Sequence, residues 1–214
     1  MRSPARAERG PRRNAVFINI PYDAAYEDLY LALIAGFCSF DLMPRATVEI
    51  AGSERRLERI LNLIRSCRYS FHDLSRVDLD PGPPPTPRFN MPFELGLVVA
   101  WTTLKRPRHE WFVLESERHR LTKSLSDLGG TDPHIHGGTP RGVLRTLTNC
   151  LVRRRRRPTL GELERVYGDV RLAATRIRRD LNADSLFEAR PFKELVIAAV
   201  RSAENRVARA SRGG

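Results

Sequence analysis

Several features common in other protein classes are missing from this 214-residue chain. No apolar run approaches the ~20 residues that a membrane-spanning helix needs, and residues 1–13 lack the apolar segment of a secretory signal. Cysteine is scarce, and Cys38, Cys67 and Cys150 are isolated from one another. This usage favours buried free thiols over a disulfide or a metal site. We therefore expect a cytoplasmic protein with no membrane partner.

Lysine is also scarce, yet the net charge is +12. Residues 1–13 carry +4 and residues 153–214 carry +8, whereas residues 14–152 hold 16 basic and 16 acidic groups. We expect a disordered basic arm over 1–13, a nucleotide-binding α/β domain over 14–152 and a basic helical hairpin over 153–214. The run Arg153–Arg157 either attracts polyanions such as nucleic acid or is a solvated linker.

Short apolar or β-branched runs alternate with helical patterns along the first half of the chain. The runs predict buried strands at 15–20, 43–50, 69–74 and 111–114. The Pro-rich segment 75–90 predicts a loop without regular structure. Strands and helices that alternate at this pitch predict a doubly wound, mainly parallel, flavodoxin-like α/β domain.

The second half of the chain predicts helices. One begins near Thr139, and two amphipathic helices follow within 159–209. Their apolar stripes favour a hairpin that packs on the α/β domain or on a second copy of the chain, as in a homo-oligomer.

Polar residues gather at one predicted edge of the sheet, beyond the carboxyl ends of the strands, where such folds bind ligands. The residues that we expect to surround a substrate are Phe17, Asn19, Tyr22, Asp23, Asp73, Ser75 and, after the fourth strand, Asp127.

Glu94 is the most informative residue, because it is the one carboxylate in the apolar helix that follows the Pro-rich loop. An unpaired buried charge is costly. The alternative is a carboxylate satisfied by the helix N-terminus. We interpret Glu94, with Asn90 one turn earlier and Asp73, as the centre of a site.

Three blocks of sequence, residues 16–23, 70–75 and 90–96, occur in the order Val-Phe-Ile-Asn-Ile-Pro-Tyr-Asp, Ser-Phe-His-Asp-Leu-Ser and Asn-Met-Pro-Phe-Glu-Leu-Gly. Together they resemble the TIR-like and nucleoside 2-deoxyribosyltransferase-like groups of flavodoxin-type domains, over about residues 14–114. In this resemblance Glu94 matches the catalytic glutamate, Asn90 the polar residue four positions earlier and Asp73 the acidic end of strand three. Tyr22 and Asp23 match the strand-one loop loosely.

The resemblance implies cleavage or transfer at the N-glycosidic bond of NAD or a related nucleotide, by a hydrolase or transferase that acts in prokaryotic antiviral defence when oligomerised. A carboxylate beside the ribose stabilises the oxocarbenium-like transition state. Asp73 or Asn90 would orient the sugar, and Phe17 or Tyr22 would stack on the base. Asn90-Met91 stands where the usual TIR motif has Trp-Cys, so the choice of substrate stays open.

No resident cofactor or metal is expected. Pro21-Tyr22-Asp23 replaces the Gly-rich phosphate fingerprint after strand one, so a nucleotide would be consumed rather than held as a redox cofactor. His134 and His136 lie in a Gly/Pro turn without firm further ligands, which is more typical of a polar loop.

Two other functions fit the same sequence. One is a non-catalytic nucleotide sensor that uses the same pocket. The other is a nucleic-acid-binding protein that acts through Arg153–Arg157 and the Arg-rich hairpin, with an affinity that falls steeply with salt.

Overall fold

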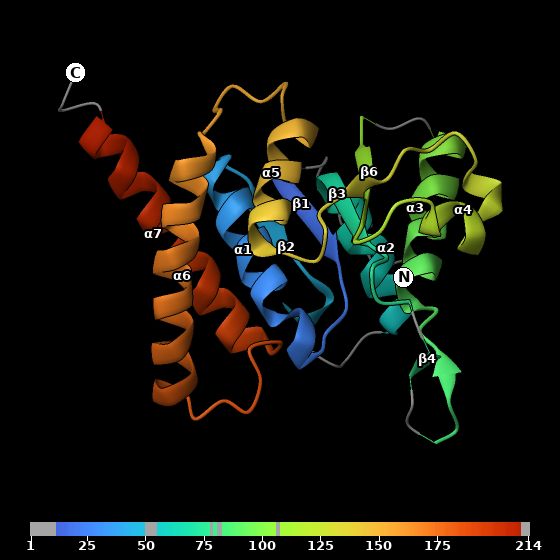
Figure 1. Cartoon of the computed structure of the whole chain (residues 1–214), viewed down its shortest axis with the longest axis horizontal. Helices are drawn as coiled ribbons and strands as arrows, with labels where there is room; N and C mark the ends of the chain where they lie inside the picture. Colours follow the sequence, from blue (N-terminus) through green and yellow to red (C-terminus); the bar gives the residue numbers. More distant parts are fainter. Residues whose placement is uncertain (1–11, 50–54, 78, 81–82, 106–107, 211–214) are drawn as a thin grey trace, which may run out of the picture.

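The fold is built on a five-stranded, all-parallel sheet with helices on both faces (Figure 1). The computed structural model describes residues 12–49, 55–77, 79–80, 83–105 and 108–210. The strand order is β2-β1-β3-β6-β7, and the strands are β1 (Arg12–Asn19), β2 (Met43–Arg45), β3 (Cys67–Asp73), β6 (Glu110–Glu115) and β7 (His134–Ile135). This is the order of flavodoxin-like doubly wound folds, so the predicted fold class is confirmed.

The central strand β1 is apolar because both of its faces are covered. Val16, Phe17 and Ile18 have no exposed surface. Val16 and Ile18 face one helical layer, whereas Phe17 faces the other. β1 pairs with β2 on one side and with β3 on the other. The direction in which the chain adds strands to the sheet therefore reverses between β1 and β3, which is the switch point of the fold.

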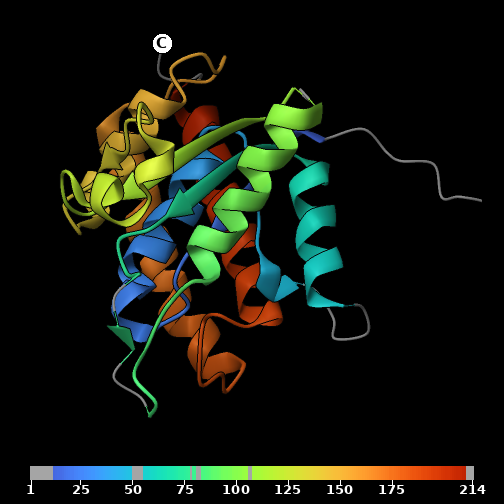
Figure 2. The ribbon, with the colours of Figure 1, turned by 90° about the vertical axis from the view of Figure 1, so that its right-hand side faces the viewer.

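Two helices cover one face of the sheet and the remaining long helices cover the other (Figure 2). On the first face, α2 (Arg56–Ser66) and α3 (Asn90–Lys105) lie side by side. On the second face, α1 (Glu27–Ser39) and α5 (Pro140–Cys150) pack on the sheet. Short elements connect these layers: η1 (Ala24–Tyr26), η2 (Thr47–Glu49), α4 (Arg120–Ser124) and η3 (Ser126–Leu128).

The C-terminal helices α6 (Leu160–Asp180) and α7 (Ala189–Ala210) pack on each other and on α1, as predicted. The Thr159 hydroxyl accepts from the Glu162 N–H, and the Glu162 carboxylate accepts from the Thr159 N–H, which closes a capping box at the start of α6. Leu163, Val170 and Leu195 belong to the same core as α1. The hairpin therefore extends the α/β core in place of forming a separate one.

Several predicted boundaries differ from the structure. The run 43–50 is strand only to Arg45, because Thr47–Glu49 turns into η2, and residues 50–54 lie outside the described residues. The Pro-rich segment contains a small antiparallel pair, β4 (Leu79–Asp80) with β5 (Thr86–Pro87), which we had predicted to be irregular. The strand β7, in a turn-rich stretch, was missed.

The predicted arm over 1–13 is wrong at its end, because Arg12 and Arg13 begin β1. Residues 1–11 lie outside the described residues. Among the helices that the structure describes, none combines the length and the apolar content needed to cross a bilayer.

Candidate functional site

Glu94 lines a cavity where the end of β1 meets the first turns of α3. Its side chain is largely buried, with 5% of the residue exposed. The cavity has a volume of about 310 Å³ and is lined by Ile20, Pro21, Tyr22, Arg56, Arg88, Asn90, Met91 and Glu94. Asn90, the first residue of α3, is exposed at the same opening. Glu94 and Asn90 therefore share one hollow at the carboxyl edge of the sheet, as the sequence predicted.

The carboxyl group of Glu94 has an unusual electrostatic environment. Within the described part of the chain it accepts no hydrogen bond and forms no ion pair. Burial raises the pKa of Glu94 to about 7, and the charge of Arg56 opposes that rise. Near neutral pH this group therefore populates both its protonated and its ionised forms, as acid–base and charge-stabilising groups in active sites do.

A buried polar chain supports the helix that carries Glu94. The Asn19 amide Nδ2 donates to Nδ1 of His72 and to the Met91 carbonyl, both at 2.9 Å. His72 Nε2 contacts the Ser70 hydroxyl at 3.0 Å, which contacts His109 Nε2 at 2.9 Å. Nδ1 of His109 completes the chain on the Cys67 carbonyl.

One set of proton positions satisfies every link of this chain with neutral rings. His72 carries its proton on Nε2, and His109 carries its proton on Nδ1. Burial lowers the pKa of His72 to about 3 and also lowers the pKa of His109. Asn19 is therefore a buried residue that positions α3. The prediction that it binds substrate is not supported, because Asn19 does not line the cavity.

Asp73 occupies a different environment from the one that we predicted. It is fully buried and accepts from the Tyr26 hydroxyl and from the Ser75 N–H at 2.9 Å, while His136 Nε2 lies 3.2 Å from its Oδ2. Burial would raise the pKa of Asp73, but His136 and the two donors outweigh burial and hold this pKa below its ordinary value. Asp73 does not line the Glu94 cavity, so its expected role beside the sugar is corrected to a structural one.

A second buried carboxylate stands close to Asp73 at the same end of the sheet. Glu115, on β6, is 1% exposed and accepts from the Ser116 N–H at 2.8 Å. Arg120 Nη1 lies 4.0 Å away and also donates to the Ser75 carbonyl. Burial raises the pKa of Glu115, and the charge of Asp73 adds to the rise. Arg120 is therefore held at the end of β3 and β6 by the Glu115 carboxylate and the Ser75 carbonyl.

Asp23 holds the loops around the cavity entrance. It pairs with Arg76 at 3.0 Å and with Arg88 at 2.5 Å, and Arg88 lines the cavity. Asp23 precedes η1 without capping it through its side chain. Asp23 therefore lies beside the cavity, in a cluster of ion pairs. Arg88, and not Asp23, lines the cavity, so the predicted contact of Asp23 with a substrate would be indirect, through its ion pair with Arg88.

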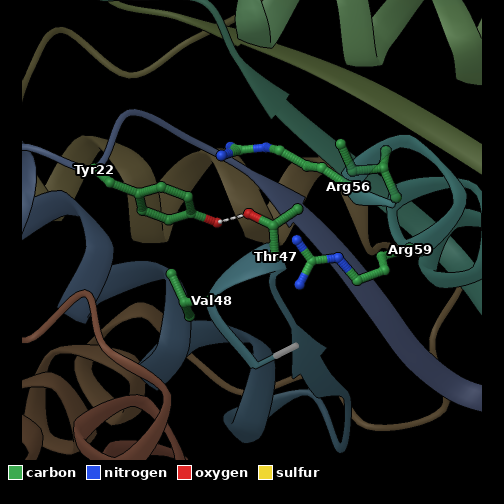
Figure 3. A pocket seen from close by; sticks show the side chains of 6 residues that line it. Tyr22, Thr47, Val48, Arg56 and Arg59 are labelled. Atoms are coloured by element: carbon green, nitrogen blue, oxygen red, sulfur yellow. Dashed lines mark hydrogen bonds between the residues drawn. The ribbon is translucent and has the colours of Figure 1, made fainter. Parts of the chain in front are cut away.

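Tyr22 lines the Glu94 cavity and also a second, smaller cavity, which is drawn in Figure 3. Its hydroxyl is within 3.0 Å of the Thr47 hydroxyl. Burial raises the pKa of Tyr22, so the hydroxyl stays protonated. Its position fits the predicted place in the strand-one loop.

Three other predicted residues are not brought to the cavity. Phe17 is fully buried between the sheet, α2 and α3, where it cannot stack on a base. Ser75 is buried and its backbone serves Asp73 and Arg120. Asp127 is exposed on η3 and is not among the residues that line the Glu94 cavity.

Arg154 and Arg156, in the predicted polyanion-binding run, bind carbonyl groups of the protein itself. Arg154 donates to the Asp41 carbonyl at 3.1 Å, past the end of α1, and lies over the Tyr69 ring. Arg156 donates to the Ala203 carbonyl in α7 at 3.0 Å. Arg154 and Arg156 therefore connect the end of α1 to α7, while Arg153, Arg155 and Arg157 are exposed to solvent.

The expected absence of a metal centre concerns His134 and His136. His136 faces Asp73, and its Nδ1 accepts from the Gly138 N–H. Across the described ranges, no group of three or more His, Cys, Asp or Glu side chains has the arrangement of a metal site.

The sequence interpretation missed the basic lining of the two cavities. Arg56 and Arg59 were not among the predicted site residues, yet both line a cavity. Tyr26 and His136 were also missed as partners of Asp73. The only sequence signal for Arg56 and Arg59 was their place at the start of a helix that follows an edge loop.

Comparisons of the chain with protein-family models, with curated proteins and with solved structures found no match. The resemblance to TIR-like and deoxyribosyltransferase-like domains therefore depends on its sequence motifs and on the position of Glu94.

Proposed function

We propose that the protein cleaves or transfers at the N-glycosidic bond of NAD or a related nucleotide, with Glu94 as the catalytic residue. One observation carries this proposal: a nearly buried carboxyl group, free of ion pairs among the described residues, faces a cavity at the switch point of a parallel sheet. The motif resemblance adds a role in prokaryotic antiviral defence and activity in an oligomer.

The chemistry needs an anionic group beside C1′ of the ribose. As the C1′–N bond breaks, its electron pair leaves with the base and positive charge develops on C1′ and the ring oxygen. The ionised Glu94 carboxylate stabilises that charge from a largely buried position, where electrostatic interactions are stronger than in water. Water or a second nucleophile then forms the new bond to C1′ and releases a proton.

Asn90 and Tyr22 are the other residues placed to touch a substrate. Asn90 carries an amide that donates and accepts hydrogen bonds with ribose hydroxyls. Tyr22 adds an aromatic side chain to the lining of the same cavity. Both line the cavity with Glu94, whereas Asp73 and Ser75 do not.

The experiment is a product assay on the purified full-length protein. NAD and a panel of nucleotides and nucleosides are incubated with it, and free bases and sugar products are identified by mass spectrometry. We expect one free base, together with a ribosyl product that shows hydrolysis, transfer or cyclisation. Intact substrates throughout the panel, at a protein concentration where oligomers form, would contradict the proposal.

A further inference from the structure

A second cavity adjoins the Glu94 cavity and has a different chemical character. It measures about 240 Å³ and is lined by Tyr22, Thr47, Val48, Arg56, Arg59 and Ile60 (Figure 3). Tyr22 and Arg56 line both cavities. Each cavity is near or below the lower limit of about 300 Å³ for small-molecule sites, so together they fit one ligand better than two.

The lining of the second cavity is positively charged. Arg56 and Arg59 extend from α2 toward the Tyr22–Thr47 pair, and none of the described residues that line this cavity carries a carboxylate (Figure 3). Arg56 is exposed and has no ion pair with any described residue. Arg88, by contrast, is paired with Asp23. Two guanidinium groups thus converge on a small hollow within a segment whose overall charge is zero.

The hydroxyl groups add donors to that charge. Tyr22 and Thr47 share one hydrogen bond of 3.0 Å, which uses the proton of one hydroxyl and leaves the proton of the other for a ligand. Arginine and hydroxyl donors together are the usual set for phosphate oxygens, and a guanidinium group binds phosphate through two parallel hydrogen bonds.

We propose that this second cavity, with Arg56 and Arg59, binds a phosphate group of the substrate whose ribose lies against Glu94. The substrate is then a phosphorylated nucleotide, such as a nucleoside monophosphate or a dinucleotide, and not a free nucleoside. The inference rests on the proposed function for the identity of the sugar. The binding of a phosphate group, by contrast, is inferred only from the two arginines of α2, Arg56 and Arg59.

Binding is tested apart from turnover, on protein carrying Glu94→Gln. The probes are matched pairs: nicotinamide mononucleotide with nicotinamide riboside, and adenosine monophosphate with adenosine. Calorimetric titration should show at least one monophosphate binding about tenfold or more tightly than its nucleoside, since each charge-assisted contact is worth about that factor. Adding Arg56→Gln and Arg59→Gln should remove this difference, and the affinity should fall as salt rises.

Arg65→Gln is the matched control, because Arg65 is exposed in the last turn of the same helix and lines neither cavity. It should leave the preference for the monophosphate unchanged. Equal binding within every pair, no binding of any probe, or a preference that survives loss of both arginines would each overturn the phosphate site. Phosphate-dependent binding without base release in the product assay would keep the site and remove the proposed function. Equal cleavage of nucleosides and nucleotides would keep the proposed function and overturn the phosphate site.

Discussion

Asn19 at the end of β1 donates a 2.9 Å hydrogen bond to the Met91 carbonyl in the first turn of α3. The same amide nitrogen donates to His72 on β3. The side-chain amide of Asn19 thus joins three elements that are far apart in the sequence. Its contact on α3, Met91, stands three residues before Glu94. The direction in which Glu94 enters its cavity depends on this contact.

Replacing Asn19 should therefore loosen the site as well as the core. Asn19→Leu removes the donor and leaves the Met91 carbonyl and His72 Nδ1 buried without it, which should cost about 1–3 kcal/mol of unfolding free energy. Urea denaturation measures that cost. The exposed Asn14→Leu on the same strand is the control and should cost far less. A cost for Asn19→Leu no greater than that of the control would show that the amide does not anchor α3.

The raised pKa of Glu94 makes the stability of the fold depend on pH. An unfolded glutamate ionises near pH 4.5, whereas the folded Glu94 ionises near pH 7. Ionisation of the folded group is thus unfavourable, so the contribution of Glu94 to native stability should fall as pH rises from about 4.5 through 7. Glu94→Gln lacks this titration and should gain roughly 3 kcal/mol relative to wild type between these pH values.

Paired denaturation curves at pH 4.5 and pH 8 measure this gain. If the two proteins keep the same difference in stability at both pH values, the Glu94 carboxyl group is exposed to solvent or paired, and the site as described is incorrect.

His72 should make a contribution to stability that is lost in mild acid. Its pKa is lowered to about 3 in the fold, against 6.5 when unfolded, so the unfolded chain binds the additional proton. The contribution of His72 to stability should decline as pH falls from about 6.5 toward 3, by roughly 2–3 kcal/mol at pH 4.5, and it opposes the contribution of Glu94 over this range. The pKa of Asp73 is lowered below 3.8, so its contribution is lost only at more acidic pH.

His72→Gln tests this assignment. The variant should be less stable than wild type at pH 7, because the chain from Asn19 to Ser70 is disturbed, and this difference should shrink as pH falls from 6.5 to 4.5. Curves that remain parallel to those of wild type would place the acid-sensitive group elsewhere.

Much of this fold could be predicted because buried parallel strands are apolar on both faces. The run around Val16 and the run in β6 were located by that property, whereas β3 carries buried polar side chains at Ser70, His72 and Asp73. The two-residue strand His134–Ile135 could not be, because so short a pairing is set by its neighbour β6 and leaves no period of its own. The segment after Arg45 is similar, since β-branched residues there entered η2 and not a strand.

The sequence predicted Glu94 as the central residue of the site, but it did not predict several of the residues that surround it. Glu94 was visible because a lone carboxylate stands out in an apolar helix. The partners of Asp73 were not, because Tyr26 and His136 lie 47 and 63 positions away in the chain and meet Asp73 only through the sheet. Arg56 and Arg59 have the spacing of a solvent-facing helix side, and helical spacing does not reveal a cavity at the end of that side.

The most direct test of the central claim compares base release by wild type, Glu94→Gln and the control Glu58→Gln, which changes an exposed glutamate on α2. The substrate is the one that the product assay identifies, and kcat/KM is measured from pH 5 to 9. We predict that wild-type activity rises with pH through about 7, as Glu94 ionises. Glu94→Gln should lose about 10³-fold or more in kcat/KM while remaining folded, and Glu58→Gln should match wild type. Glu94→Gln activity within tenfold of wild type would contradict the account.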